Sequence, residues 1–177
     1  MKPHGKKAIL VTGVSGSGKS RVSSHFRDLG YESYDIEAIE GMFAHYRKDT
    51  GEVFEDYENI PKKIGNADWI CDKDKLKKLL DEQKSNLAFY FGVPSNMDDI
   101  FPLFQKVIVL TTSPETLAKR LSSREGTDAI GATEETRQMI LGWKDWWENQ
   151  MKKKNAVFIN AEENPDEVTK KILEVTL

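Results

Sequence analysis

Residues 13–20 have the sequence Gly-Val-Ser-Gly-Ser-Gly-Lys-Ser. This stretch has the form G-x-x-x-x-G-K-S/T, which is typical of phosphate-binding loops. The apolar run Ala8–Val11 before it predicts a buried parallel strand, and residues Arg21–Leu29 after it predict an amphipathic helix. Because strand, glycine-rich turn and helix is the context that the motif requires, the sequence predicts a loop that binds nucleotide phosphates.

Each part of the loop has a chemical reason. Glycines permit positive φ angles and a close approach of the backbone to a ligand, and the N–H groups at a helix start attract anions. Lys19 would reach the β- and γ-phosphates, and the Ser20 hydroxyl would lie on Mg²⁺. The residues expected to bind nucleotide are Gly13, Ser15, Gly16, Ser17, Gly18, Lys19, Ser20 and Arg21.

The composition limits the class of protein. The chain has 177 residues, of which 38% are apolar, so we expect a single domain over 1–177 with one sizeable core. The formal net charge of −3 gives no electrostatic case for nucleic acid as an obligatory partner. The one cysteine, Cys71, excludes an intrachain disulfide and suits a small buried position. No segment predicts a signal peptide or a membrane span, so we expect a cytoplasmic protein.

Four further strands are predicted along the chain, and helices separate most of them. Helix starts are expected where Asp72, Ser113, Thr133 and Asn164 can cap the first turn. The alternation predicts an α/β fold with an open parallel sheet covered on both faces. The predicted strands are 31–34, 87–91, 107–110 and 156–159.

One further helix is predicted after the second strand. Ile36, Ile39, Met42, Phe43 and Tyr46 repeat at helical spacing, and residues 49–51 are expected to end that helix. Residues 52–69 are polar with scattered aromatics, and we expect an irregular excursion above the sheet there, without a second domain.

Several candidate side chains fall where strands of such a sheet end. Ligands of open α/β sheets bind beyond the carboxyl ends of the strands. The phosphate loop, Asp35, Glu37, Gly92 and residues 160–165 all lie at such ends in the predicted fold. Their convergence predicts one active site, independently of the loop motif.

The chain resembles the small P-loop kinases of the shikimate, gluconate and nucleoside-monophosphate (adenylate) kinase group over nearly its whole length. The resemblance rests on the phosphate loop, the carboxylates after the second strand, the Leu-Ala-Lys-Arg-Leu sequence at 117–121 followed by Arg124, and the final strand–loop–Pro–helix. It implies a P-loop NTPase three-layer sandwich with a five-stranded parallel sheet and a short lid at about 121–137. It also implies ATP and Mg²⁺ as cofactors.

The resemblance assigns roles to three arginines. Arg120 and Arg124 would begin the lid and stabilise the charge that phosphoryl transfer spreads over the equatorial oxygens. Arg137 is a candidate third arginine that would contact substrate. Adenine would lie between the Arg120 region and residues 160–165. Surface ion pairs are the alternative for Arg120 and Arg137.

Asp35 and Glu37 look like the acidic pair that follows the second strand in shikimate kinases. Asp35 would hold a water on Mg²⁺ or act as the base, and Glu37 would bind the acceptor. The two carboxylates point the same way only if the backbone is still extended there. The alternative is an acidic pair that favours the positive end of a helix.

The departures from the family leave the acceptor open. The segment after the third strand has one glycine, Gly92, so shikimate itself is disfavoured, and no Walker-B acid closes that strand. Arg47 is the only arginine between Arg27 and Arg120, which disfavours a phosphorylated acceptor. We therefore expect an ATP- and Mg²⁺-dependent kinase of a small hydroxylated molecule, as monomer or homodimer. The alternatives are a nucleoside or nucleoside-monophosphate kinase, and a regulatory or assembly ATPase with slow hydrolysis.

Overall fold

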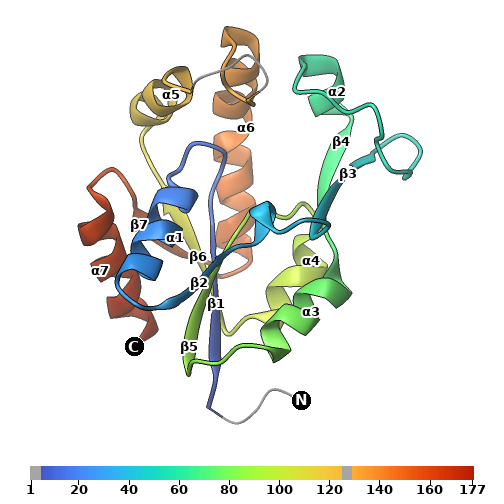
Figure 1. Cartoon of the computed structure of the whole chain (residues 1–177). Helices are drawn as coiled ribbons and strands as arrows, with labels where there is room; N and C mark the ends of the chain where they lie inside the picture. Colours follow the sequence, from blue (N-terminus) through green and yellow to red (C-terminus); the bar gives the residue numbers. More distant parts are fainter. Residues whose placement is uncertain (1–4, 125–128) are drawn as a thin grey trace.

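A five-stranded parallel sheet lies at the centre of the computed structural model, which describes residues 5–124 and 129–177 (Figure 1). The strand order is β2-β5-β1-β6-β7, with β1 in the middle. The sequence prediction of five parallel strands is therefore confirmed. The strands are β1 (Lys7–Thr12), β2 (Glu32–Asp35), β5 (Leu87–Phe91), β6 (Lys106–Thr111) and β7 (Val157–Asn160).

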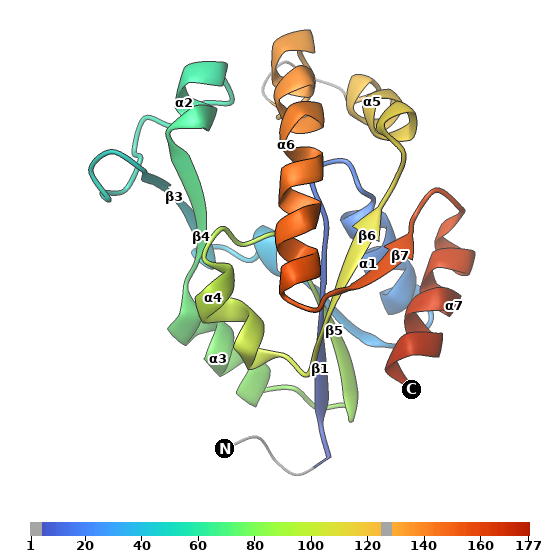
Figure 2. The same cartoon turned by 180° about the vertical axis from the view of Figure 1, so that it is seen from behind.

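Helices cover both faces of the sheet, which gives three layers (Figures 1 and 2). Alternate residues of β1 serve the two faces: Ile9 and Val11 pack with one group of helices, and Ala8 and Leu10 face the other side. The first face is covered by α1 (Lys19–Asp28) and α7 (Pro165–Thr176). The second is covered by α3 (Lys73–Asp81), α4 (Met97–Ile100), α5 (Pro114–Ser122) and α6 (Glu134–Lys153).

The predicted helix starts are confirmed by their capping hydrogen bonds. The side chains of Asp72, Ser113, Thr133 and Asn164 each accept from a backbone N–H in the first turn of the helix that follows. These bonds satisfy donors that have no partner within the helix. The caps therefore fix where α3, α5, α6 and α7 begin.

The predicted helix over residues 36–46 is wrong. Only a short 3₁₀ turn, η1 (Ile36–Ala38), follows β2, and Gly41 then adopts a φ of +72° that no helix accommodates. The next residues form β3 (Phe43–Arg47), which pairs antiparallel with β4 (Ala67–Cys71). The spacing of the apolar residues matched a helix, but β-prone side chains and a partner strand far along the chain decided the structure.

The region predicted to be irregular, residues 52–69, contains more structure than expected. It holds α2 (Pro61–Gly65) and the first residues of β4. The hairpin formed by β3 and β4 projects beyond the carboxyl end of the sheet, with α2 at its far end (Figures 1 and 2). The segment is thus an ordered excursion that overhangs the end of the sheet where the candidate site lies. A second 3₁₀ turn, η2 (Phe101–Leu103), follows α4.

No helix within residues 5–124 and 129–177 is both long and apolar enough to cross a membrane.

Candidate active site

The candidate site lies at the carboxyl edge of the central sheet. The loop of residues 13–20 leaves β1 at this edge, Asp35 ends β2, Gly92 follows β5, and residues 160–165 follow β7. The ends of these strands point to one side of the molecule, below the hairpin and the start of α6 (Figure 1). The backbone therefore brings together the segments that the sequence singled out, and the side chains decide what they can do.

The phosphate loop has a shape that requires glycine. Gly16 and Gly18 have φ angles of +89° and +101°. A Cβ at Gly16 would lie 2.8 Å from the side chain of Leu121, and one at Gly13 would lie 2.8 Å from a backbone oxygen of β6, closer than real Cβ atoms come. The hydroxyl of Ser17 is buried without a hydrogen-bond partner among the described residues. A tight glycine turn with an unpaired donor fits a bound phosphate.

Lys19 folds back over this loop. Its Nζ donates to the carbonyl oxygen of Gly13 at 2.7 Å. Burial lowers the pKa of Lys19, and the positive charge of Arg124 acts in the same direction. The carboxylates of Glu37 and Asp35 raise it. Both acidic side chains of the predicted pair thus act electrostatically on one ammonium, which lies on the loop where a phosphate would need a cation.

Asp35 points toward the phosphate loop. Its Oδ2 accepts a 2.9 Å hydrogen bond from the hydroxyl of Ser20. Although Asp35 precedes η1, its side chain caps no backbone N–H of that turn. A carboxylate beside a hydroxyl is an oxygen donor set that suits Mg²⁺. No group of three or more histidine, cysteine or acidic side chains comes together as a metal site within the described residues, so nucleotide oxygens and water would complete the coordination.

Glu37 has a different partner from Asp35. Its Oε2 accepts a 2.6 Å hydrogen bond from the indole Nε1 of Trp69, on β4. Gly92 leaves room for this side chain, because a Cβ there would lie 3.3 Å from Cγ of Glu37 and 2.8 Å from Cγ1 of Ile36. Sequence reasoning counted Trp69 among the scattered aromatics of residues 52–69 and missed its bond to Glu37, which depends on a hairpin that was not predicted.

Arg120 bridges two loops of the candidate site. Its guanidinium donates to the carbonyl oxygen of Ser17 at 3.2 Å and to that of Ala161 at 2.7 Å. Burial lowers its pKa, nearby Arg21 acts in the same direction, and Glu162 raises it. Arg120 therefore ties the phosphate loop to the segment after β7, on the side where adenine was predicted.

Arg124 lies on the opposite side of the phosphate loop. It donates to the hydroxyl of Ser15 at 2.9 Å and to the carbonyl oxygen of Ile130 at 2.7 Å. Burial lowers the pKa of Arg124. Arg124 thus joins the phosphate loop to Ile130 within the predicted lid, of which residues 125–128 lie outside the described part of the structure.

Arg137 bonds to residues close to it in the sequence, at the start of α6. It donates to the carbonyl oxygens of Gly131 and Ala132 and pairs with Glu134 at 2.8 Å. None of these contacts includes the phosphate loop or the acidic pair. Arg21, the last residue of the predicted nucleotide set, is exposed on α1.

The comparisons with known proteins agree with this geometry. A family model described as an AAA domain matches residues 9–141, which is more than half of the chain. The chain belongs to the AAA domain family. A search of curated proteins finds no match to this AAA domain protein.

Several solved structures similar to this chain are of kinases. Shikimate kinase from Acinetobacter baumannii in complex with shikimate is 19% identical with a TM-score of 0.60, over 96% of this chain and 92% of that chain. Deoxyadenosine kinase from M. mycoides with bound dATP is 16% identical with a TM-score of 0.55, over 95% and 98%. A gluconokinase from Sinorhizobium meliloti is 17% identical with a TM-score of 0.53, over 97% and 92%. The fold is therefore that of small P-loop kinases, as the sequence resemblance predicted.

Sequence reasoning missed Glu162, an acidic residue in the segment after β7. Its carboxylate accepts from the backbone N–H of Ser113 at 2.9 Å and from the hydroxyl of Thr116 at 2.9 Å. These hydrogen bonds lower the pKa of Glu162 to about 2. The bonds join the segment after β7 to the start of α5, the helix that carries Arg120. The sequence signal was the acidic residue in the loop before Asn164, but no local pattern names its partners.

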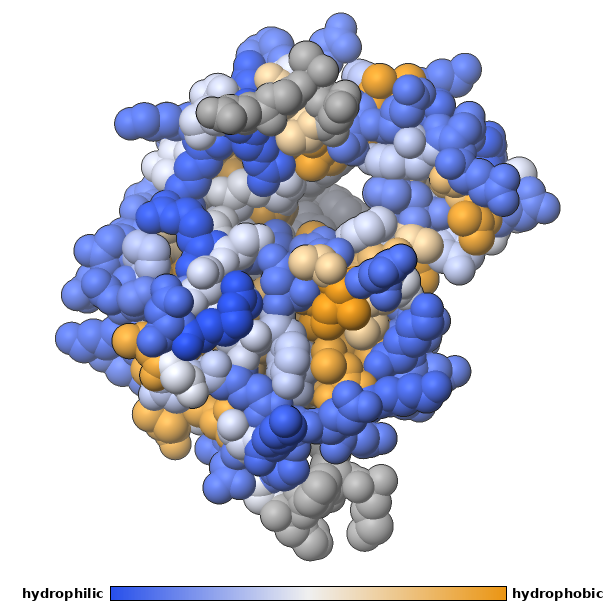
Figure 3. Space-filling view, in the orientation of Figure 1, coloured by the Kyte–Doolittle hydropathy of each residue, from blue (hydrophilic) through white to orange (hydrophobic). Residues whose placement is uncertain are grey.

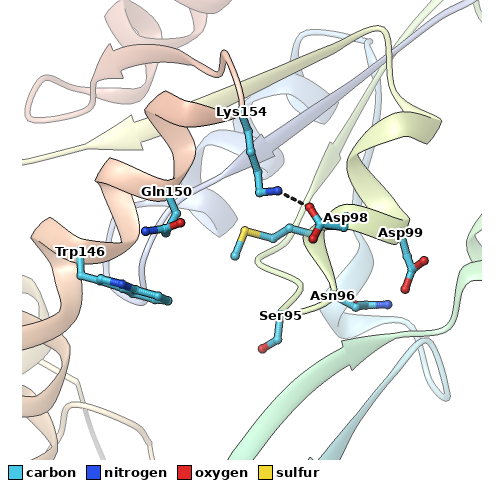
Figure 4. Close-up of a pocket in the computed structure, with 8 residues that line it drawn as sticks. Ser95, Asn96, Asp98, Asp99, Trp146, Gln150 and Lys154 are labelled. Atoms are coloured by element: carbon cyan, nitrogen blue, oxygen red, sulfur yellow. Dashed lines mark hydrogen bonds and ion pairs between the residues drawn. The ribbon is translucent and has the colours of Figure 1, made fainter.

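The surface is hollowed between the hairpin and the elements that carry the lid, above the end of the sheet (Figure 3). A separate cavity of about 330 Å³ lies between α6 and the segment before α4 (Figure 4). Ser95 and Asn96 line one side of this cavity and Trp146 lines the other, and no residue of the phosphate loop takes part. The hollow, and not this cavity, adjoins the candidate site.

Proposed function

We propose that this AAA domain protein is an ATP-dependent kinase that transfers the γ-phosphoryl group of ATP, with Mg²⁺, to a hydroxyl of a small molecule. The observation that carries the proposal is the different bonding of the two acidic side chains: Asp35 bonds to Ser20, next to Lys19 in the phosphate loop, and Glu37 bonds to Trp69. A site that only held a nucleotide would need the lysine but not two carboxylates with different partners. The second carboxylate, Glu37, would bind the acceptor.

The nucleotide would be held from three directions. The backbone N–H groups of residues 13–20 would bind the phosphates, with Lys19 as the cation. Arg120 would stand on the adenine side, and Arg124 on the side of the transferred phosphoryl group. Guanidinium groups suit this place because they give fixed, forked donors to phosphate oxygens.

Ser20 and Asp35 would hold the metal. When bound, Mg²⁺ neutralises charge on the β- and γ-phosphates. The hydrogen bond between the two side chains supports this assignment, because it already aims a hydroxyl oxygen and a carboxylate oxygen at one place. Asp35 would also accept the proton of the attacking hydroxyl, directly or through water, and Glu37 would bind and orient the acceptor.

The charges around the hairpin bear on the choice among acceptors. Arg47, the one arginine of this region, donates to Asp49 and lies over the ring of Phe54 at 4.7 Å. It is therefore engaged within the hairpin, which disfavours a nucleoside monophosphate as acceptor. An unphosphorylated nucleoside stays a candidate beside other hydroxylated metabolites. A location in the cytoplasm, where ATP is supplied, also stays a prediction.

An assay of ADP release tests the proposal. The protein with ATP and Mg²⁺ is given polyols, sugars, nucleosides and nucleoside monophosphates in turn, with Lys19→Ala as the control for contaminating kinases. Stimulation by one class of acceptor, absent in Lys19→Ala, supports the proposal and names the class. Tight nucleotide binding with no stimulation by any compound favours the alternative, a regulatory or assembly ATPase with slow hydrolysis.

A further inference from the structure

Trp69 connects the hairpin to the acidic pair at the end of β2. The indole N–H is a donor without acceptor capacity, and its 2.6 Å bond goes to one carboxylate oxygen of Glu37. A bond from a neutral donor to a charged acceptor is among the stronger hydrogen bonds of proteins. One oxygen of Glu37 is thereby fixed, and no side chain within residues 5–124 and 129–177 donates a hydrogen bond to its Oε1.

The position of Trp69 is itself determined by the segment after β5. The backbone N–H of Trp69 donates to Oγ of Ser95 at 2.9 Å, and the N–H of Ser95 donates to the carbonyl oxygen of Trp69 at 2.8 Å. At Cys71, two residues after Trp69 on β4, the backbone makes two hydrogen bonds of 3.0 Å with the side chain of Asn96. Ser95 and Asn96, drawn in Figure 4, thus hold the edge of β4 that faces the main sheet.

Aromatic contacts hold the ring of Trp69 as well. Phe43 stacks against it with ring centroids 5.0 Å apart, and His45 lies at 4.3 Å. Tyr57 extends the row by stacking on His45 at 3.5 Å. Such a packed row leaves the indole little freedom to rotate, so its N–H edge stays directed at Glu37.

The same row carries no positive charge toward Glu37. Burial lowers the pKa of His45 to about 4, so this imidazole is neutral at pH 7. Three basic side chains of the hairpin segment form ion pairs with acids of that same segment. A fourth, Lys62, is exposed on α2. These pairs join Arg47 to Asp49, Lys48 to Asp68, and Lys63 to Asp56 and Glu58.

We propose that the Trp69–Glu37 pair is the acceptor-hydroxyl site of this kinase, with Trp69 as a positioning residue that holds Glu37 for an acceptor that carries no negative charge. The proposal rests on the kinase function proposed above. A carboxylate with one oxygen fixed presents the other to a hydroxyl donor in a defined direction. The same carboxylate repels an anionic acceptor, and Arg47, Lys48 and Lys63 of the hairpin segment are paired with acids of that segment.

The indole signals in a ¹H–¹⁵N spectrum test the pair without turnover. Trp69→Phe assigns the Trp69 signal among the tryptophans, and the exposed Trp146 serves as the internal control. Glu37→Ala should move the Trp69 signal upfield and speed its exchange with water, leaving Trp146 unchanged. A Trp69 signal indifferent to Glu37→Ala overturns the proposal, whether or not the protein proves to be a kinase.

Ligand titration of the same signal, with the ATP analogue bound, tests the acceptor class. A neutral polyol or nucleoside should move the Trp69 signal, and gluconate or a nucleoside monophosphate should not. A larger response to the anionic compounds, or no response to any compound, contradicts the proposal. Failure of the kinase proposal is read separately, as absence of phosphoryl transfer from ATP.

Kinetics then separate positioning from a merely structural role. Trp69→Phe keeps a ring and loses the donor, so the KM of the acceptor should rise roughly tenfold while the KM of ATP stays the same. In a Glu37→Ala background the Trp69→Phe change should add little, because residues that act through one another are not additive. An equal effect on the acceptor KM in both backgrounds would show that Trp69 acts independently of Glu37 and would contradict the proposal. Trp146→Phe is the matched control and should change neither KM.

Discussion

Oγ of Ser20 donates a 2.9 Å hydrogen bond to Oδ2 of Asp35, joining the end of the phosphate loop to the end of β2. The two strands involved, β1 and β2, are not neighbours in the sheet, because β5 lies between them. The contact therefore spans a strand, at the edge where the site lies. This contact supports the proposal that Asp35 serves the metal and Glu37 the acceptor.

Asp35→Asn should lower ATP hydrolysis without acceptor by roughly 10²–10³-fold and weaken its dependence on Mg²⁺. The amide keeps the shape but removes a charge beside the metal and a proton acceptor. Asp28→Asn, at an exposed position at the end of α1, is the matched control. Normal hydrolysis with unchanged Mg²⁺ dependence in Asp35→Asn would mean that Ser20, the nucleotide and water hold the metal without Asp35.

Lys19→Ala should leave a folded protein and remove turnover, by roughly 10²–10³-fold or more, because the developing phosphate charge loses its cation. Lys77→Ala, on the exposed side of α3, should keep the parent rate. Circular dichroism checks that both variants fold. Turnover at the parent rate in Lys19→Ala would mean that the phosphate-loop assignment is wrong.

Arg120 and Arg124 should differ from each other. Arg120→Ala removes the tie between Ser17 and Ala161, so ATP binding without acceptor should weaken roughly tenfold. Arg124→Ala should lower kcat more than it weakens ATP binding, because a residue beside the lid acts mainly once the site has closed. Calorimetry with an ATP analogue and steady-state kinetics separate the two. Equal losses of affinity and turnover in both variants would contradict this division.

His45 should make the protein less stable as pH falls from about 6.5 to about 4. Burial lowers its pKa to about 4 in the folded chain, so in this window the unfolded chain takes up a proton that the folded chain does not. Stability present at neutral pH is thus lost on acidification. Because His45 is only half-buried, we expect about 1 kcal/mol, less than the full shift implies. His45→Phe should lose less stability between about pH 7 and about pH 5 in urea unfolding. An equal loss in both proteins contradicts the assignment.

Much of the fold could be predicted because its signals are local. β1, β5 and β6 contain short apolar runs, and caps such as Asp72 and Thr133 need only their own helix. The loop motif names its backbone shape directly, since Gly16 and Gly18 take the positive φ angles that the motif implies. The sequence analysis placed Asp35 and the phosphate loop at the same edge of the sheet, and the hydrogen bond between Ser20 and Asp35 agrees with that placement.

The hairpin could not be predicted, because its signals are long-range. Ile36, Ile39 and Met42 keep a helical spacing, and all three lie in or against the core as a helix face would. What decides the structure is the pairing of β3 with β4, whose partner residues are 20 to 28 positions apart in the chain, and local periodicity does not reveal it. The bond of Trp69 to Glu37 depends on that pairing, so sequence reasoning could not find it.

Direct detection of phosphoryl transfer tests the central claim most closely. The wild-type protein and Lys19→Ala are incubated with Mg²⁺, ATP labelled on the γ-phosphate, and neutral hydroxylated compounds, and the products are separated. The account predicts a labelled acceptor formed in equal amount to ADP by the wild type and absent with Lys19→Ala. ADP formed with all of the label released as inorganic phosphate, at a rate that no acceptor changes, would contradict it.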